Sequence, residues 1–465
     1  MSDATPFGPT LEDRIQAAGS PVQLLRGPGQ LGPYVFPGIA AEFTNWRDEV
    51  RAWKDSVALL EQSYHMSELQ LRGKDVIPFL SEIAVNRFDP FRVGRAKQVV
   101  LASPDGFLIG DAILFHEDDD FFRIVGAPFA HDWVQYRANE SDYDVTAELN
   151  HNWSVVEAPR DVFRFQIQGP FALELVRELV EGTLPDVGFF SIADVTIAGK
   201  SVRALRHGMA GTPGFEIYGP WDDQQAVRAA FAEAGAKYGL RTVGASAYAT
   251  TAQESGWLPL PLPAIYHGEE LKSYRQATSA FSLESMGSLG GSLLSDRIED
   301  YYVDPIEAGY GRLVDWDRSF VGRDALREKA DNQKREKVTL VWNDEDVAAT
   351  IQSSLFDSQH PAQFIALPSP MYATWAADAV QSGGQTIGFS QYMSFSANAG
   401  HILSHGILDR ELATPGTELT LMWGEPDSRR DNVGRNELRE IRVTVAPTPY
   451  FDKVIKRAAQ VPASV

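Results

Sequence analysis

Two segments of the chain carry the same order of features, and this order limits the folds that the sequence can adopt. Residues 69–72 alternate apolar and polar side chains, are followed by a glycine, and lead into a helical pattern over residues 75–83. Residues 165–168 alternate in the same way before Gly169, and Pro170 suits the first position of the helix that follows. A strand, a glycine and a helix in each unit predict two related α+β halves, although the residues themselves do not repeat.

The C-terminal part of the chain has a different pattern. Short strands separated by glycine, proline, asparagine and aspartate turns are expected at residues 387–389, 418–423 and 442–445. This spacing is typical of a small all-β barrel or sandwich, and a charged linker over residues 327–337 precedes it. A chain of 465 residues is also too long for one ordinary core. We therefore expect a first region over residues 1–335 and a β domain over residues 336–465.

Composition excludes several classes of protein. The absence of cysteine excludes disulfides, thiolate metal sites and a cysteine nucleophile. A formal net charge of -21 argues against nucleic acids and anionic membranes as partners. No apolar run is long enough to span a membrane, and the N-terminal residues lack the basic start and apolar core of a secretory signal. We expect a cytoplasmic protein that binds small molecules.

Motifs for several common chemistries are missing from the sequence. There is no glycine-rich dinucleotide fingerprint, no P-loop and no Gly-x-Ser-x-Gly elbow. His401 and His405 have the spacing of helical metal ligands, but the glycine and serine residues around them indicate strand and turn. The four carboxylates at residues 117–120 are typical of a solvated turn. No metal site is predicted.

Residues 205–220 place one carboxylate between two glycine-rich turns. Glu216 stands between Phe215 and Ile217 on a short alternating strand, so it projects from the other face of that strand. A glutamate at such a position usually points to solvent. Held inside a protein, its two oxygens can instead accept from adjacent N–H donors of a planar ligand such as a pterin.

The sequence of this segment carries a family resemblance. Arg-His-Gly-Met-Ala-Gly followed by Pro-Gly-Phe-Glu-Ile-Tyr-Gly-Pro resembles the folate-binding segment of the glycine-cleavage T-protein superfamily, and in detail the tetrahydrofolate-dependent aryl O-demethylases. Residues 300–311 and 320–326 resemble segments that end the catalytic part of that superfamily. The resemblance implies two related α+β domains and a C-terminal β-barrel, with tetrahydrofolate in the central channel between the domains. It also implies methyl transfer from an aromatic methoxy group to tetrahydrofolate.

The resemblance assigns residues to both substrates. Tyr248 matches a tyrosine placed close to the ether oxygen, while Tyr34 and His65 match residues that line the methoxyarene pocket. From residue type alone, Tyr248 is more typical of a packed aromatic, and His65 of a hydrogen-bonded core histidine.

For folate, the resemblance assigns Glu216 to the pterin and adds Gln166, Arg206 and Trp257. Asp111 matches the aspartate near the reacting folate nitrogen, where a structural hydrogen-bonding role is an equal alternative.

One departure from the demethylase pattern bears on the methoxyarene. Vanillate-type enzymes read Val-Gly-Arg-Ala-Pro where this chain reads Val125-Gly126-Ala127-Pro128, so the arginine that meets a substrate carboxylate has no counterpart. Arg123 is nearby in sequence but need not reach the same space. The substrate is then either an ortho-methoxybenzoate, such as the chlorinated herbicide dicamba, or a phenol of the guaiacol type without a carboxylate.

The sequence is also compatible with two other functions. One is aminomethyl or other one-carbon transfer from an amine donor, as in the wider superfamily. The other is folate binding without catalysis, although the superfamily members that act in protein assembly use a cysteine that this chain lacks.

Overall fold

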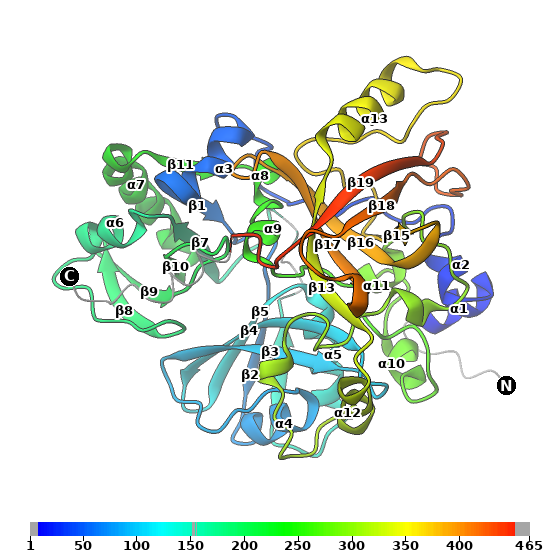
Figure 1. Ribbon diagram of the computed structural model, residues 1–465. Helices are drawn as coiled ribbons and strands as arrows, with labels where there is room; N and C mark the ends of the chain where they lie inside the picture. Colours follow the sequence, from blue (N-terminus) through cyan, green and yellow to red (C-terminus); the bar gives the residue numbers. More distant parts are fainter. Residues whose placement is uncertain (1–7, 151–153, 155, 452–465) are drawn as a thin grey trace.

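The computed structural model describes residues 8–150, 154 and 156–451. A six-stranded sheet, a five-stranded sheet and a closed barrel meet near the middle of the molecule (Figure 1). The short helices α8 (Ala245–Tyr248) and α9 (Thr251–Ser255) lie where these units come together. The predicted fold class, two α+β units and a C-terminal barrel, is confirmed.

The six-stranded sheet has one apolar and one polar face. In spatial order its strands are β11 (Leu240–Val243), β1 (Val57–Glu61), β7 (Val162–Gln168), β10 (Gly214–Pro220), β9 (Lys200–Arg206) and β8 (Ile192–Ile197). Phe163, Phe165 and Ile167 of β7 enter a core formed with α6 (Ala172–Leu179) and α7 (Gln224–Gly235). Because side chains alternate along a strand, Arg164 and Gln166 take the opposite face, toward the other two units.

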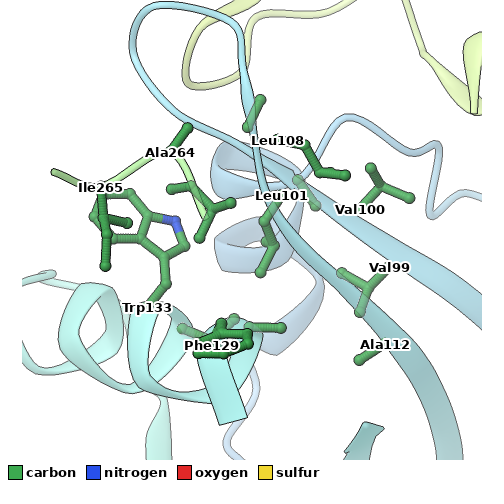
Figure 2. Packing of buried hydrophobic residues seen from close by; sticks show 14 of the residues in the cluster. Val99, Val100, Leu101, Leu108, Ala112, Phe129, Trp133, Ala264 and Ile265 are labelled. Atoms are coloured by element: carbon green, nitrogen blue, oxygen red, sulfur yellow. The ribbon is translucent and has the colours of Figure 1, made fainter. Parts of the chain in front are cut away.

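The five-stranded sheet positions the segment that follows α9. Its strands, in spatial order, are β3 (Arg95–Ala102), β4 (Leu108–Asp118), β5 (Phe121–Gly126), β2 (Ser67–Arg72) and β6 (Thr146–Leu149). Figure 2 shows Phe129 and Trp133 of α5 (Pro128–Asn139) beside Leu101 of β3 and Ile265. The amide of Ala264 also donates to the carbonyl of Leu108 at 3.0 Å. Apolar packing and this bond hold the chain after α9 against the sheet.

The two predicted strand–glycine–helix units occur, one in each sheet. Gly73 separates β2 from α4 (Val76–Ile83), and Gly169 separates β7 from α6. Both glycines have positive φ, 129° and 132°, and a Cβ there would lie 2.1 Å from the carbonyl oxygen of Asp144 and 2.4 Å from that of Ser56. Only glycine fits such a close backbone approach, so the shared feature of the two halves is a conformation and not a repeated sequence.

The C-terminal unit is a closed β-barrel. In spatial order its strands are β13 (Arg335–Trp342), β17 (His401–Asp409), β16 (Gln385–Ser396), β15 (Asp378–Ser382), β18 (Glu418–Trp423) and β19 (Arg439–Ala446). Leu340, Trp342 and Trp423 fill its interior, and α13 (Asp344–Phe356) follows β13 outside it. All three C-terminal segments expected as strands lie within barrel strands.

The charged stretch over residues 327–337 is not an irregular linker. It forms the end of α12 (Arg323–Asp331) and the start of β13, with a short connection between them. Strong helix-forming residues and the barrel pairing of β13 order this stretch. The domain limit at residues 335 and 336 stays a prediction.

The remaining elements connect these units. They are α1 (Leu11–Ala18), α2 (Pro21–Leu25), α3 (Trp46–Asp55), η1 (Trp221–Asp223), η2 (Ala236–Tyr238), α10 (Lys272–Ala277), α11 (Leu283–Met286), β12 (Leu289–Gly290), η3 (Ile298–Tyr301), η4 (Gly311–Leu313), β14 (Trp375–Ala376) and η5 (Arg410–Leu412). Within the described ranges, none of the helices combines the length and apolar character needed to cross a bilayer.

Candidate active site

Glu216 lies on the polar face of the six-stranded sheet and is 3% exposed. It stands directly opposite Gln166 in the antiparallel pair of β10 and β7. Its Oε1 accepts from the Nη1 group of Arg164, which precedes Gln166 by two residues on the same face. Glu216 is therefore an inward carboxylate fixed by a guanidinium, and the solvent-facing alternative is wrong.

Arg164 belongs to a chain of buried charges that crosses from one sheet to the other. Its Nη2 donates to Oε1 of Glu68 on β2 at 2.7 Å, and Oε2 of Glu68 accepts from Arg123 on β5. Burial opposes ionisation of Glu68, but the two guanidinium groups outweigh it and lower the pKa of that carboxyl. Burial opposes the charge of Arg164 as well, but the carboxylates of Glu216 and Glu68 outweigh it and raise the pKa of Arg164. Arg164 and Glu68 are therefore charged near neutral pH.

Several polar atoms beside Glu216 are buried and have no hydrogen-bond partner in the described part of the chain. They are Oε1 of Gln166, Nε2 of Gln168 and Nδ1 of His207. The opposite ends of both amides are fixed, because Nε2 of Gln166 donates to the carbonyl of His207 at 3.1 Å and Oε1 of Gln168 accepts from the amide of Met209 at 2.9 Å. Fixed unsatisfied donors and acceptors next to a carboxylate fit a flat heteroaromatic ring such as a pterin.

Tyr34, Phe36, His65 and Tyr248 form one aromatic cluster. The ring centroids of His65 and Tyr248 lie 4.6 Å apart, and Phe36 lies 5.0 Å from His65 and 4.7 Å from Tyr248. Tyr34 packs on Phe36 at 5.4 Å, and its hydroxyl donates to the carbonyl of His65 at 3.4 Å. The structure thus brings together the three residues assigned to the methoxyarene and adds Phe36.

The protonation states of this cluster follow from burial. Burial raises the pKa of Tyr248, and the nearby charge of Glu216 adds to the effect, so Tyr248 is a neutral phenol able to donate a proton. Burial lowers the pKa of His65 to about 3. Both ring nitrogens of His65 are buried, and neither has a hydrogen-bond partner among the residues that the structure describes. His65 is therefore neutral and is not the hydrogen-bonded core histidine that its residue type suggests.

Gln62 connects the aromatic cluster to the polar sheet face. Its Nε2 donates to the hydroxyl of Tyr248 at 3.2 Å, and its backbone amide donates to the carbonyl of Arg164 at 2.9 Å. Tyr248 lies at the end of α8. Glu49 fixes the start of this helix, because its Oε2 accepts from the amide of the N-cap residue Gly244 at 2.8 Å.

Asp111 and Trp257 form a second group, near the barrel. The indole Nε1 of Trp257 donates to Oδ2 of Asp111 at 3.1 Å, and Nε2 of Gln98 donates to the same oxygen at 2.8 Å. Burial raises the pKa of Asp111, although these donors and Lys337 oppose the shift. Trp257 keeps 37% of its surface exposed, which leaves an indole face available for stacking.

Arg206 lies apart from Glu216. It is paired with Phe215, whose side chain enters the apolar core, and its Nη1 donates to the carbonyl of Val187 at 3.1 Å. Strand alternation therefore directs Arg206 away from the face that carries Glu216. Its assignment to folate stays a prediction.

The turn between β5 and α5 is where vanillate-type demethylases carry the arginine that this chain lacks. Ala127 caps the start of α5, one residue after β5 ends. Arg123 is 7% exposed and forms ion pairs with Glu68 and with Glu117, the latter at 3.1 Å. Arg123 is thus committed to the buried charge network.

His401 and His405 lie on β17 and not on a helix. Nδ1 of His401 contacts Asp344 at 2.9 Å near the surface, whereas His405 is fully buried. The described residues contain no group of three or more His, Asp or Glu side chains arranged to hold a metal.

Sequence reasoning missed Gln62, Arg164, Phe36 and Tyr392. Arg164 continues the polar alternation of Gln166 and Gln168, so that signal was available. Tyr392 has a left-handed backbone, φ 48°, at a bulge of β16 where the register shifts. The carbonyl of Tyr392 accepts from the side-chain Nε2 of the buried Gln253. Oε1 of Gln253 in turn accepts from the hydroxyl of Ser394 at 2.7 Å. A strained backbone held from both sides is typical of a functional position, and no local sequence pattern announces it.

Comparisons with known proteins show the family of the whole chain. Residues 21–260 match the GCVT N-terminal domain. Syringate O-demethylase of a Sphingobium species is 40% identical over 444 residues, covering 95% of this chain and 96% of that protein. Sesamin methylene transferase of a Sinomonas species is 30% identical, covering 90% and 91%. The crystal structure of the glycine cleavage system aminomethyltransferase T from Bartonella henselae has a TM-score of 0.60 at 15% identity, covering 91% and 95%, which shows a shared fold.

Fold and relatives together define an enzyme that transfers one-carbon groups. The chain belongs to the GCVT family and, within it, to the tetrahydrofolate-dependent O-demethylase type. It is a tetrahydrofolate-dependent methyltransferase, and tetrahydrofolate is the methyl acceptor in this type.

Proposed function

We propose that the protein removes the methyl group of a methoxybenzoate and transfers it to tetrahydrofolate, giving a phenol and 5-methyltetrahydrofolate. The bond between the methyl carbon and the ether oxygen breaks, and the methyl carbon forms a bond to N5 of the folate. The N5 proton is lost, and the departing oxygen takes up a proton.

Tyr248 is proposed as the acid for the departing oxygen. Phenolate is a mediocre leaving group, so protonation or hydrogen bonding of the oxygen lowers the barrier. The observation that carries this role is the buried, neutral phenol of Tyr248 against His65 and Phe36. Gln62, which donates to the hydroxyl of Tyr248, orients that hydroxyl. Tyr34 and His65 line the methoxyarene pocket.

Glu216 and Gln166 are proposed to hold the pterin, with Trp257 stacking on the folate. Support for the first two is the row of fixed, unsatisfied polar atoms on their sheet face. Asp111 is proposed to lie near the reacting nitrogen, where a carboxylate stabilises the positive charge that develops as the methyl group arrives.

The substrate is proposed to carry its carboxylate ortho to the methoxy group. Arg123 is committed to Glu68 and Glu117, and Ala127 offers no cation. The unsatisfied ring nitrogens of His65 lie next to Tyr248, so a carboxylate adjacent to the ether would find a donor there. Dicamba is one instance of this substrate class.

The test is a screen of the purified protein with tetrahydrofolate against vanillate, syringate, guaiacol and ortho-methoxybenzoates including dicamba. Formation of 5-methyltetrahydrofolate is followed by mass spectrometry. We expect turnover of an ortho-methoxybenzoate, and a loss of about 10²- to 10⁴-fold in kcat for Tyr248→Phe. Tyr238→Phe, on the outer side of the six-stranded sheet, is the matched control. Turnover of guaiacol alone would show that the substrate carries no carboxylate. Transfer only from a methylamine donor would show that the enzyme is not an O-demethylase.

A further inference from the structure

Lys337 brings a charged group from the barrel to the centre of the molecule. Along β13, Val338, Leu340 and Trp342 point into the barrel, so Lys337 points outward, toward the other two units. Its Nζ donates to the carbonyl of Gly256 at 2.9 Å and to that of Ala308 at 2.6 Å. The ammonium therefore joins two loops that belong to neither barrel nor sheet.

Each of these loops supplies an aromatic partner to Asp111. Gly256 immediately precedes Trp257, whose indole donates to Oδ2 of Asp111. Ala308 lies two residues before Tyr310, whose hydroxyl accepts at 3.1 Å from Nε2 of Gln98, the same amide that donates to Asp111. Lys337 thus fixes the backbone next to both aromatic side chains of the Asp111 group.

The charges at this point are few and mutually dependent. Burial lowers the pKa of Lys337 to about 8, and the carboxylate of Asp111 opposes that shift. In turn, Lys337 opposes the effect of burial on Asp111. The other titratable groups that face this pair are Tyr310, whose pKa burial raises, and His405 of β17, whose pKa burial lowers to about 3. Both are neutral near pH 7, which leaves Lys337 as the counter-charge for Asp111 within this group.

We propose that Lys337 is a positioning residue for methyl transfer, which fixes the backbone beside Trp257 and Tyr310 around Asp111 and favours the charged form of the Asp111 carboxylate. This role rests on the proposed function of Asp111 beside the reacting folate nitrogen. A charged carboxylate stabilises the cationic nitrogen that forms as the methyl group arrives, whereas a protonated one does not.

Three variants separate the charge of Lys337 from its hydrogen bonds. Lys337→Gln keeps donors for the two carbonyls without the charge, Lys337→Met removes both, and Lys337→Arg keeps the charge. Lys334→Met, at an exposed residue just before β13, is the control. For Lys337→Gln we expect kcat to fall about tenfold with KM for the methoxyarene nearly unchanged, and the acidic limb of the kcat profile to move up by about one pH unit. Lys337→Arg should restore that limb.

A second readout does not depend on activity. The carboxyl carbon of Asp111, assigned with Asp111→Asn, is titrated by NMR in the full-length protein with ¹³C-labelled aspartate. We expect its pKa to be higher in Lys337→Gln than in the parent protein. An unchanged Asp111 titration in a folded Lys337→Gln would overturn the proposal even if the enzyme is active. A shifted titration in a protein without demethylase activity would uphold the positioning and reject the proposed reaction.

Discussion

Arg164 of β7 and Glu68 of β2 form a buried ion pair, 2.7 Å between Nη2 and Oε1, that joins the two sheets of the enzyme. The other side of Arg164 contacts Glu216, and the other oxygen of Glu68 contacts Arg123. The group proposed to meet the pterin is therefore positioned by a charge network that begins in the opposite sheet.

Removing the centre of this network is expected to be costly. Arg164→Met leaves Glu68 and Glu216 buried near each other without their shared counter-charge, and breaking such a pair typically costs about 3–5 kcal/mol. Denaturant unfolding of the purified variant measures this loss. Glu68 keeps its ion pair with Arg123, so the double variant Arg164→Met/Glu216→Gln removes the carboxylate that has lost its guanidinium and should recover part of the stability. As control, Lys237→Met at an exposed ion pair with Glu178 should leave the unfolding free energy nearly unchanged. A similar small effect for Arg164→Met would contradict the network's structural role.

Tyr392 is expected to affect the methoxyarene and not the folate. It comes from the barrel strand β16. Burial raises the pKa of Tyr34 and of Tyr248, and the phenol of Tyr392 adds to both shifts, so it lies near both tyrosines of the aromatic cluster. Tyr392→Phe keeps the ring and removes one hydroxyl, for which we expect a rise of about five- to tenfold in KM for the methoxyarene. Steady-state kinetics and calorimetric titration with tetrahydrofolate measure the two effects. Weaker folate binding with an unchanged KM for the methoxyarene would contradict this prediction and indicate that Tyr392 contacts the folate.

The parts of the site that depend on strand alternation could be predicted from the sequence. Glu216 and Gln166 share a face because both lie at alternating positions of adjacent strands, and Arg164 follows the same rule. The barrel strands were equally visible, since their turns are rich in glycine and proline. Alternation along each strand is local, whereas the inward placement of Glu216 came from the family resemblance, because its residue type alone favours solvent.

Contacts between distant loops could not be predicted in this way. The bond between Trp257 and Asp111 spans 146 residues, and that between Lys337 and Gly256 spans 81. Both depend on how parts distant in the chain pack together, which no local pattern encodes. Arg206 shows the converse, because a family motif assigned it to folate while strand alternation directs it to the opposite face from Glu216.

The contribution of Asp378 to the stability of the enzyme is expected to fall as pH rises toward neutrality. Burial raises the pKa of this carboxyl from 3.8 to about 7. Between these values the folded state holds the proton and the unfolded chain releases it, so raising the pH favours unfolding until Asp378 ionises in both states. Asp378→Asn mimics the protonated acid, and its oxygen can still accept from Tyr372 and the amide of Ser292.

The variant should therefore be stabilised relative to the parent protein at pH 7 to 8 by a few kcal/mol, and by much less near pH 4. Thermal unfolding measured across this pH range tests the prediction. An advantage that does not depend on pH would assign the effect to packing and not to the proton.

The turn between β5 and α5 is expected to determine where the substrate carries its carboxylate. β5 ends at Gly126 and α5 begins at Pro128, so only Ala127 separates them. A Cβ on Gly126 would lie 2.9 Å from Cβ of Ala112, which excludes an arginine at that position. An arginine inserted between Gly126 and Ala127 instead restores the Val-Gly-Arg-Ala-Pro order of vanillate-type demethylases. We expect the insertion to raise kcat/KM for vanillate by about tenfold or more, since a bidentate partner for a carboxylate contributes roughly 1.5–3 kcal/mol, and to leave tetrahydrofolate binding intact.

Insertion of leucine at the same place controls for the longer loop. Equal gains for both insertions would show that loop length, and not the cation, sets the preference, whereas a gain for arginine alone would identify this turn as the determinant of where the substrate carries its charge.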